Sequence, residues 1–135
     1  MMIPSHYGTF PAKTLLVLTN NELAKLFTLV DREIEPLSVV VTDEPVPDTD
    51  LPSSGDLDHA KQVRRAELYR LLNDELKRVI ASEQIVDLIL CVPEANKNDL
   101  EAALSQDILK HLKTLVPKNL ASMELTQVTR ILFEA

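Results

Sequence analysis

The strongest structural signal in the sequence is an amphipathic pattern between Asp58 and Ile80. Apolar side chains recur in it at steps of three and four residues, which is the period of an α-helix with one buried face. The members of this stripe are Val63, Ala66, Tyr69 or Arg70, Leu72, Leu76, Val79 and Ile80. The pattern is long enough for about six helical turns. We expect Asp56 or Asp58 to cap the helix, where a carboxylate also faces the positive end of the helix dipole.

The residues before the acidic stretch at position 42 carry a β-like pattern instead. Short apolar runs with β-branched residues predict three strands, at residues 13–20, 22–31 and 33–41. The period of the second run alone would also allow a helix. Turn-forming pairs, Asn20–Asn21 and Asp31–Arg32, separate the runs. Pro36 lacks a backbone donor and therefore places the third strand at a sheet edge or at a bulge. Two tight turns between three strands predict an antiparallel meander.

The chain beyond the long helix is predicted to alternate between strands and helices. An apolar run at residues 84–93 ends in proline and is typical of a central strand buried on both faces. The other predicted elements are a second helix from Asp99 to about Leu115, a short strand near 119–121 and a terminal helix from Ser122. Asn98 or Asn96 is expected to cap the second helix, and Pro117 to stop it. The two apolar stripes are Leu100, Leu104, Ile108, Leu112 and Leu115, and then Leu125, Val128, Ile131 and Leu132.

The order of these elements, β-β-β-α-β-α-β-α, combines a meander with β-α-β crossovers. A crossover joins parallel strands, so the predicted sheet is mixed and has helices packed on it. This order fits an α/β fold with ribonuclease-H-like topology. A chain of 135 residues is the size of one ordinary domain, and we expect a single one covering residues 1–135.

The charge and cysteine content restrict the classes of partner. The chain has 14 basic and 21 acidic residues, a formal net charge of -7, so free DNA or another polyanion would be repelled unless basic side chains cluster. A single cysteine, Cys91, excludes an internal disulfide. No apolar run approaches the ~20 residues that span a bilayer, and the first ten residues do not resemble a signal peptide. We therefore expect a cytoplasmic location and no membrane partner.

Residues 42–58 stand out by composition, with three prolines, six carboxylates and no basic residue. Such a composition is typical of an exposed loop, and we predict one here. Whether the loop is a recognition surface or only a connection is left open by its composition.

Basic side chains follow this acidic segment closely. Lys61, Arg64 and Arg65 are spaced by about one helical turn and could form a patch that binds RNA or an acidic protein surface. Ion pairs within the chain, to Asp56, Asp58 or Glu67, are the common alternative for such a cluster. His59 lies between the loop and the patch and could exchange protons there, although an exposed structural role is the more frequent one.

Four stretches of the sequence resemble the bacterial host attachment protein family. They are LLVLTNNELAKLFTL, DLDHAKQVRRAELYRLLNDELKRV, VDLILCVPE and KNLASMELTQVTRIL, and the resemblance covers the chain from Lys13 onward. That family is similar to the middle domain of archaeal and eukaryotic peptide-chain release factors and their bacterial relatives. The resemblance implies a ribonuclease-H-like fold and a link to the ribosome or to a translation-related protein.

The same resemblance argues against peptide-release activity. In release factors, the loop before the long helix carries a Gly-Gly-Gln motif that positions water against the ester. The matching positions here are Ser53, Ser54, Gly55 and Asp56, with no second glycine and no glutamine. An acidic loop would also be repelled by ribosomal RNA. We therefore expect a non-catalytic binding module, whose candidate binding residues are Ser53, Ser54, Gly55, Asp56, Asp58, His59, Lys61, Arg64 and Arg65.

An alternative function is a hydrolase that acts on RNA or a nucleotide. Its candidate carboxylates are Asp31, Glu33, Glu35 and Asp87. Two-metal catalysis needs several acids to converge on ions about 4 Å apart, whereas the first predicted strand contains no acid at all. Turn and capping roles are therefore the more common explanation for these residues.

No metal site or cofactor is expected from the remaining chemistry. The three histidines, His6, His59 and His111, lie far apart in the sequence and share no ligand spacing with Cys91. Cys91 itself is expected to be a small buried residue. Self-association through the edge of the third strand or through the terminal helix would give a homodimer, and the sequence leaves both monomer and homodimer open.

Overall fold

The structure, a computed structural model, describes residues 1–42 and 54–133, and for residues 54–59 it describes the backbone alone. Its strands are β1 (Phe10–Thr19), β2 (Leu23–Asp31), β3 (Glu33–Val41), β4 (Asp87–Cys91) and β5 (Leu112–Val116). Its helices are α1 (Ser54–Ser82), α2 (Lys97–Ala103), α3 (Gln106–Leu109) and α4 (Leu125–Phe133), with short 3-10 helices at Ser5–Tyr7 and Glu94–Asn96. None of the described helices is both long and apolar enough to cross a membrane.

The strands form one mixed sheet in the order β3-β2-β1-β4-β5. β2 runs antiparallel to both of its neighbours, while β4 is parallel to β1 and to β5. The predicted α/β fold, with a mixed sheet and ribonuclease-H-like topology, is confirmed. β1 and β4 lie in the interior of the sheet, which explains why their sequences are apolar on both faces.

The antiparallel meander is confirmed, and its turns use the predicted residues. The Asn20 side-chain oxygen accepts hydrogen bonds from the backbone N–H groups of Glu22 and Leu23, at 2.7 and 2.8 Å. Asp31 has a φ of 55°, a left-handed conformation that aspartate tolerates in tight turns. Pro36 lies on edge strand β3 next to a register shift, so both explanations offered for this proline hold.

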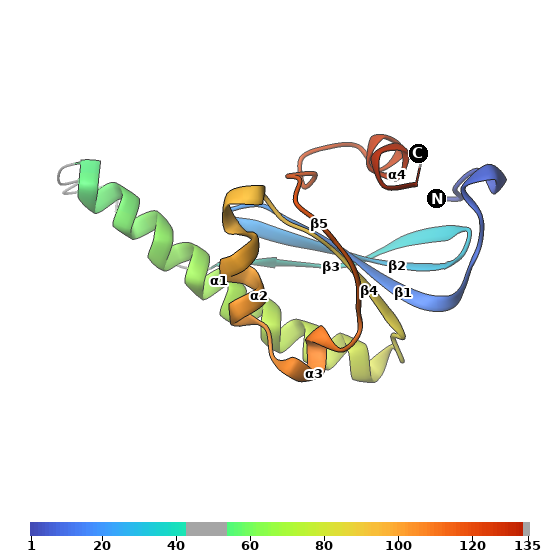
Figure 1. Cartoon of the computed structure of the whole chain (residues 1–135), viewed down its shortest axis with the longest axis horizontal. Coiled ribbons are helices and arrows are strands. Elements are labelled where there is room, and N and C mark those ends of the chain that lie inside the picture. The colour runs from blue at the N-terminus through green and yellow to red at the C-terminus, as the bar shows by residue number, and fades with distance from the viewer. Residues whose placement is uncertain (43–53, 134–135) are drawn as a thin grey trace.

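Helices cover both faces of the sheet (Figure 1). On one face, α1, α2 and α3 pack over alternate residues of the central strands, among them Leu15, Val17, Leu88 and Leu90. On the other face, α4 covers the residues in between, among them Leu16, Leu18, Ile89 and Cys91. Because side chains alternate along a strand, each central strand contributes to both core layers.

The long helix is confirmed, but it begins earlier than the sequence pattern indicated. α1 starts at Ser54 rather than near Asp58, so neither Asp56 nor Asp58 is its N-cap. Of the predicted acidic loop, residues 43–53 lie outside the described residues, and residues 54–58 belong to α1. The first half of the helix extends past the end of the sheet (Figure 1). Val63, predicted to be buried, is therefore 54% exposed.

The length predicted for the second helix, from Asp99 to about Leu115, is wrong. The chain leaves α2 at Leu104 with extended backbone angles, and a single short helix, α3, precedes β5. The side-chain oxygen of Asn73 on α1 accepts a hydrogen bond of 2.9 Å from the backbone N–H of Ser105, which holds this break against the long helix. Leu112 and Leu115, assigned to the helical stripe, belong to β5.

Two smaller differences follow from that break. The strand expected near 119–121 lies instead at 112–116, where pairing with β4 satisfies the backbone of a segment containing β-branched Thr114 and Val116. The N-cap position of α2 is Asn96, as one of the two predicted options, yet its side-chain amide donates to the Asn21 side-chain oxygen at 2.6 Å. The terminal helix is confirmed and begins at Leu125 rather than Ser122.

Candidate functional site

The residues predicted to bind a partner lie along the first half of α1. Ser53 lies outside the described residues. Ser54, Gly55, Asp56, Asp58 and His59 have a helical backbone, and the side chains of the four that carry one lie outside the description. Lys61 is exposed, whereas Arg64 and Arg65 are half-buried. The candidates from Ser54 to Arg65 all belong to the first half of α1, which extends past the sheet (Figure 1).

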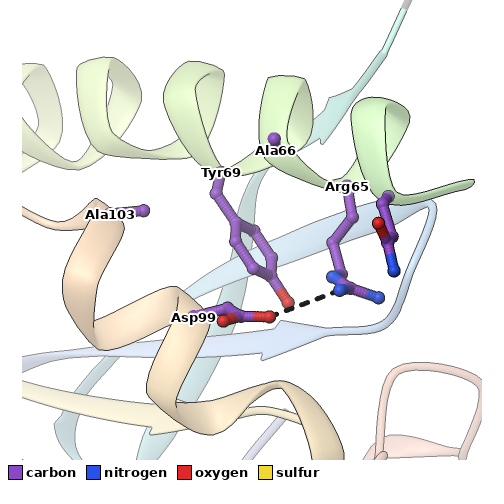
Figure 2. Close-up of a pocket in the computed structure, with 6 residues that line it drawn as sticks. Arg65, Ala66, Tyr69, Asp99 and Ala103 are labelled. Carbon is purple, nitrogen blue, oxygen red and sulfur yellow. Dashed lines mark hydrogen bonds and ion pairs between the residues drawn. The ribbon is translucent and has the colours of Figure 1, made fainter. Parts of the chain in front are cut away.

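A cleft of about 400 Å³ opens where this part of α1 meets α2 (Figure 2). The side chains that line it are Gln62, Arg65, Ala66, Tyr69, Asp99 and Ala103. The first four come from α1 at helical spacings of three and four residues, and the last two are one turn apart on α2. Alanines therefore form part of both walls, and the polar side chains gather at one end.

An ion pair joins the two helices across the cleft. A terminal guanidinium nitrogen of Arg65 lies 3.3 Å from a carboxylate oxygen of Asp99. The Arg65 side chain is 21% exposed and that of Asp99 is 63% exposed, so water screens the carboxylate more than the guanidinium. Glu67, one of the partners expected for the basic patch, is instead hydrogen-bonded to Arg70 at 3.0 Å. That contact lowers the pKa of the Glu67 carboxyl.

Tyr69 places a buried hydroxyl at the same end of the cleft (Figure 2). The residue is 2% exposed, and its hydroxyl has no hydrogen-bond partner among the described residues. Burial raises the pKa of Tyr69 to about 12, with smaller opposing effects from Arg65, which lowers it, and Asp99, which raises it. The hydroxyl is therefore protonated at neutral pH and available as a hydrogen-bond donor.

The cleft thus brings two donors and one acceptor close together. Arg65 and the Tyr69 hydroxyl donate, the Asp99 carboxylate accepts, and the Gln62 side-chain amide can do either. These are groups for binding and orienting a polar ligand.

The carboxylates of the hydrolase alternative do not converge. Asp31, Glu33 and Glu35 lie around the β2–β3 turn and are exposed, and Asp87 at the start of β4 lies 4.0 Å from the Lys113 ammonium. Within residues 1–42 and 54–133, no group of three or more His, Cys, Asp or Glu side chains could hold a metal ion. The described residues therefore give the hydrolase hypothesis no support.

The cysteine and histidines occupy separate parts of the fold. Cys91 is fully buried in β4, as predicted, and burial raises the pKa of its thiol to about 12. His6 is exposed in the first 3-10 helix. The His111 Nδ1 atom lies 3.0 Å from the Val86 carbonyl oxygen, while the side chain of His59 lies outside the described residues.

Most of this cleft could not be found from the sequence. Arg65 was a candidate, but Asp99 is 34 positions away and carried no signal beyond its place at the start of a helix. Tyr69 is a member of the predicted apolar stripe, and its burial confirms that prediction. The stripe gives no information about the partner of its hydroxyl. Only the packing of α2 against α1 makes these residues neighbours.

No protein-family model matches the chain, and neither does any curated protein. Solved structures do resemble it. The archaeal translation termination factor aRF1 superposes over 77% of this chain and 29% of its own length, with a TM-score of 0.56 and 12% identity. Dom34 from S. cerevisiae, described as a translation termination-like factor involved in RNA quality control pathways and interacting with Hbs1, superposes over 93% of this chain and 33% of its own length, with a TM-score of 0.53 and 12% identity.

The chain thus spans about a third of the length of these structures. Identity this low shows a common fold and does not transfer activity. The chain has the fold of one part of release-factor-like proteins.

Proposed function

We propose that this chain is a single-domain, non-catalytic binding module of the host attachment and release-factor-like kind, which contacts the ribosome or a translation-related protein in the cytoplasm. The observation that carries the proposal is the first half of α1, which extends past the sheet in a fold similar to that of translation termination factors. A helix without core contacts on several sides presents its side chains to a partner rather than to the sheet.

The charges of residues 60–66 support the proposal. These residues contain three cations and no anion, whereas residues 42–58 before them contain six carboxylates, two of which belong to the start of the same helix. An anionic surface would be attracted where it meets residues 60–66 and repelled by the acidic sequence before them, so the charge distribution favours one orientation of approach. Peptide release is not proposed, because the glycine pair and glutamine of the release motif are absent from the matching positions.

Ribosome co-sedimentation tests the proposal directly. We expect the wild-type chain to pellet with ribosomes at low salt and to remain in the supernatant at high salt, because exposed charges are screened. A double variant, Lys61→Glu with Arg64→Glu, should lose the low-salt binding. The matched control, Lys77→Glu with Lys118→Glu, makes the same change of charge at exposed sites elsewhere and should keep it.

Two results would count against this function. One is a wild-type chain that stays in the supernatant at low salt. The other is equal loss of binding in both double variants, which would indicate a response to net charge rather than to the α1 surface.

A further inference from the structure

We propose that the cleft between α1 and α2 binds an extended peptide segment of a partner protein by hydrogen-bonding the backbone N–H and C=O groups of one of its residues. The proposal deepens the proposed function, since it names the chemistry that the module would recognise. The nature of the ligand is argued from the cleft itself, and only the source of the peptide, a translation-related protein, rests on the proposed function.

The buried hydroxyl of Tyr69 is the first reason to expect a ligand. Buried polar groups in proteins are almost always hydrogen-bonded, because an unpaired one retains the cost of losing water. Tyr69 is 2% exposed, and its hydroxyl has no partner within the described part of the chain. The hydroxyl lies beside Asp99 and Arg65 in the cleft (Figure 2), where an acceptor atom of a ligand would pair with it.

The opposite charges beside that hydroxyl define which ligand fits. An anion that approached Arg65 and Tyr69 would be repelled by the Asp99 carboxylate, and a cation that approached Asp99 would be repelled by Arg65. A neutral peptide backbone avoids both conflicts. In an extended segment the N–H and C=O groups of one residue face the same side, so the carbonyl oxygen can accept from Tyr69 or Arg65 while the N–H group donates to Asp99.

The size of the cleft agrees with a short peptide segment. Ala66 and Ala103 lie on opposite helices, and together with four larger side chains they line a space of about 400 Å³. A peptide segment of a few residues fits into a space of this size.

A nucleobase edge offers a similar pattern of donors and acceptors, and two observations disfavour it. Bases are usually held by stacking on an exposed aromatic face, and the aromatic residue that lines this cleft, Tyr69, is buried. The Asp99 carboxylate, which lines the cleft, also repels the phosphates that accompany a base.

The test uses short capped peptides and the full-length, isotope-labelled chain followed by NMR. We expect acetyl-Ala-Ala-Ala-amide to cause saturable shifts in the backbone signals of Gln62, Ala66 and Ala103. Tyr69→Phe should weaken binding about fivefold, the effect of one lost hydrogen bond, and Asp99→Asn should also weaken it. Tyr7→Phe, a change of the other tyrosine, should bind as the wild type does. Peptides with Asp or Lys at the central position should bind no better than the alanine peptide.

Three outcomes would overturn the inference. They are the absence of saturable shifts at the cleft, unchanged affinity in Tyr69→Phe, and saturable cleft shifts with cytidine or adenosine in place of the peptide. Failure of ribosome co-sedimentation with intact peptide binding would overturn the proposed function instead, so the two proposals can fail separately.

Discussion

At the scale of single residues, two buried hydroxyl groups differ in whether they have a hydrogen-bond partner. Thr19 and Tyr69 are both buried hydroxyl residues, but the Thr19 hydroxyl donates to the Cys91 carbonyl at 2.9 Å, while that of Tyr69 is unpaired among the described residues. The first contact ties β1 to the end of β4. The second leaves a donor beside Arg65 and Asp99, which is why the cleft rather than the core is the place to look for a ligand.

The Tyr69 hydroxyl should make stability sensitive to alkaline pH. Its pKa is raised to about 12 from 10.0, so the unfolded chain loses this proton first as the pH rises above 10. Stability is then fully present below pH 10 and is lost as the pH approaches 12, at a rate of up to about 1.4 kcal/mol per pH unit. Denaturant unfolding of wild type and Tyr69→Phe across this range measures the difference, with Tyr7→Phe as the control. Parallel curves for all three proteins would contradict the prediction.

Cys91 should be inert toward thiol reagents in the folded chain. It is fully buried in β4, and burial raises the pKa of its thiol to about 12, so neither access nor thiolate is available at mildly alkaline pH. We expect an aromatic disulfide reagent to label it only after denaturant is added. Rapid labelling of the native chain, followed by absorbance, would mean that β4 is exposed to solvent.

At the scale of elements, the sequence predicted strands and helices correctly where the apolar pattern agreed with the turn residues beside it. The body of α1 and α4 were found from their helical periods, and β4 from its continuous apolar run. The period of β2 alone also allowed a helix, and the turn residues Asn20 and Asp31 on either side of it favoured a strand. The prediction of one helix from Asp99 to Leu115 was wrong because Leu100, Leu104, Ile108 and Leu112 satisfy a helical stripe whether or not the helix continues. The hydrogen bond from the Ser105 backbone to the Asn73 side chain holds the chain where the helix is interrupted, and the sequence pattern gives no sign of this contact.

The two halves of α1 should contribute very differently to stability. Leu72 is fully buried, whereas Val63 is 54% exposed. Leu72→Ala should lower the free energy of unfolding by about 2–5 kcal/mol through a core cavity. Val63→Ala should cause no loss, and alanine's helix propensity could add about 0.5 kcal/mol. Chemical denaturation of the two variants tests this, and a loss of similar size in both would mean that the first half of α1 is packed.

At the scale of the whole molecule, a compact sheet with helices on both faces carries one helix that extends beyond it (Figure 1). Basic side chains and the cleft lie on or beside that extension, while six of the 21 acidic residues fall in residues 42–58, immediately before the basic side chains in the sequence. The spacing of Lys61, Arg64 and Arg65 predicts a basic patch, and of these three side chains Arg65 forms an ion pair with Asp99 within the chain. The sequence could not predict the length of the extension, because the start of a helix outside the core has no apolar period to mark it.

Hydrogen exchange should separate these two parts. Amides of β1 and β4 are interior to the sheet and should exchange only through global unfolding. Amides at residues 60–66 of α1 should exchange orders of magnitude faster through local fraying, since few contacts hold that half in place. Mass spectrometry of peptides from the deuterated chain reads both rates, and equal protection would contradict the division.

The first half of α1 also bears on how such a chain can change over time. Since the side chains there contribute little to the core, substitutions at that end should change the stability of the fold very little. Selection would then act on them mainly through their effect on binding. A lineage could therefore acquire a new binding specificity through substitutions in a few turns of this helix. The sheet, which is buried on both faces, would keep the fold unchanged.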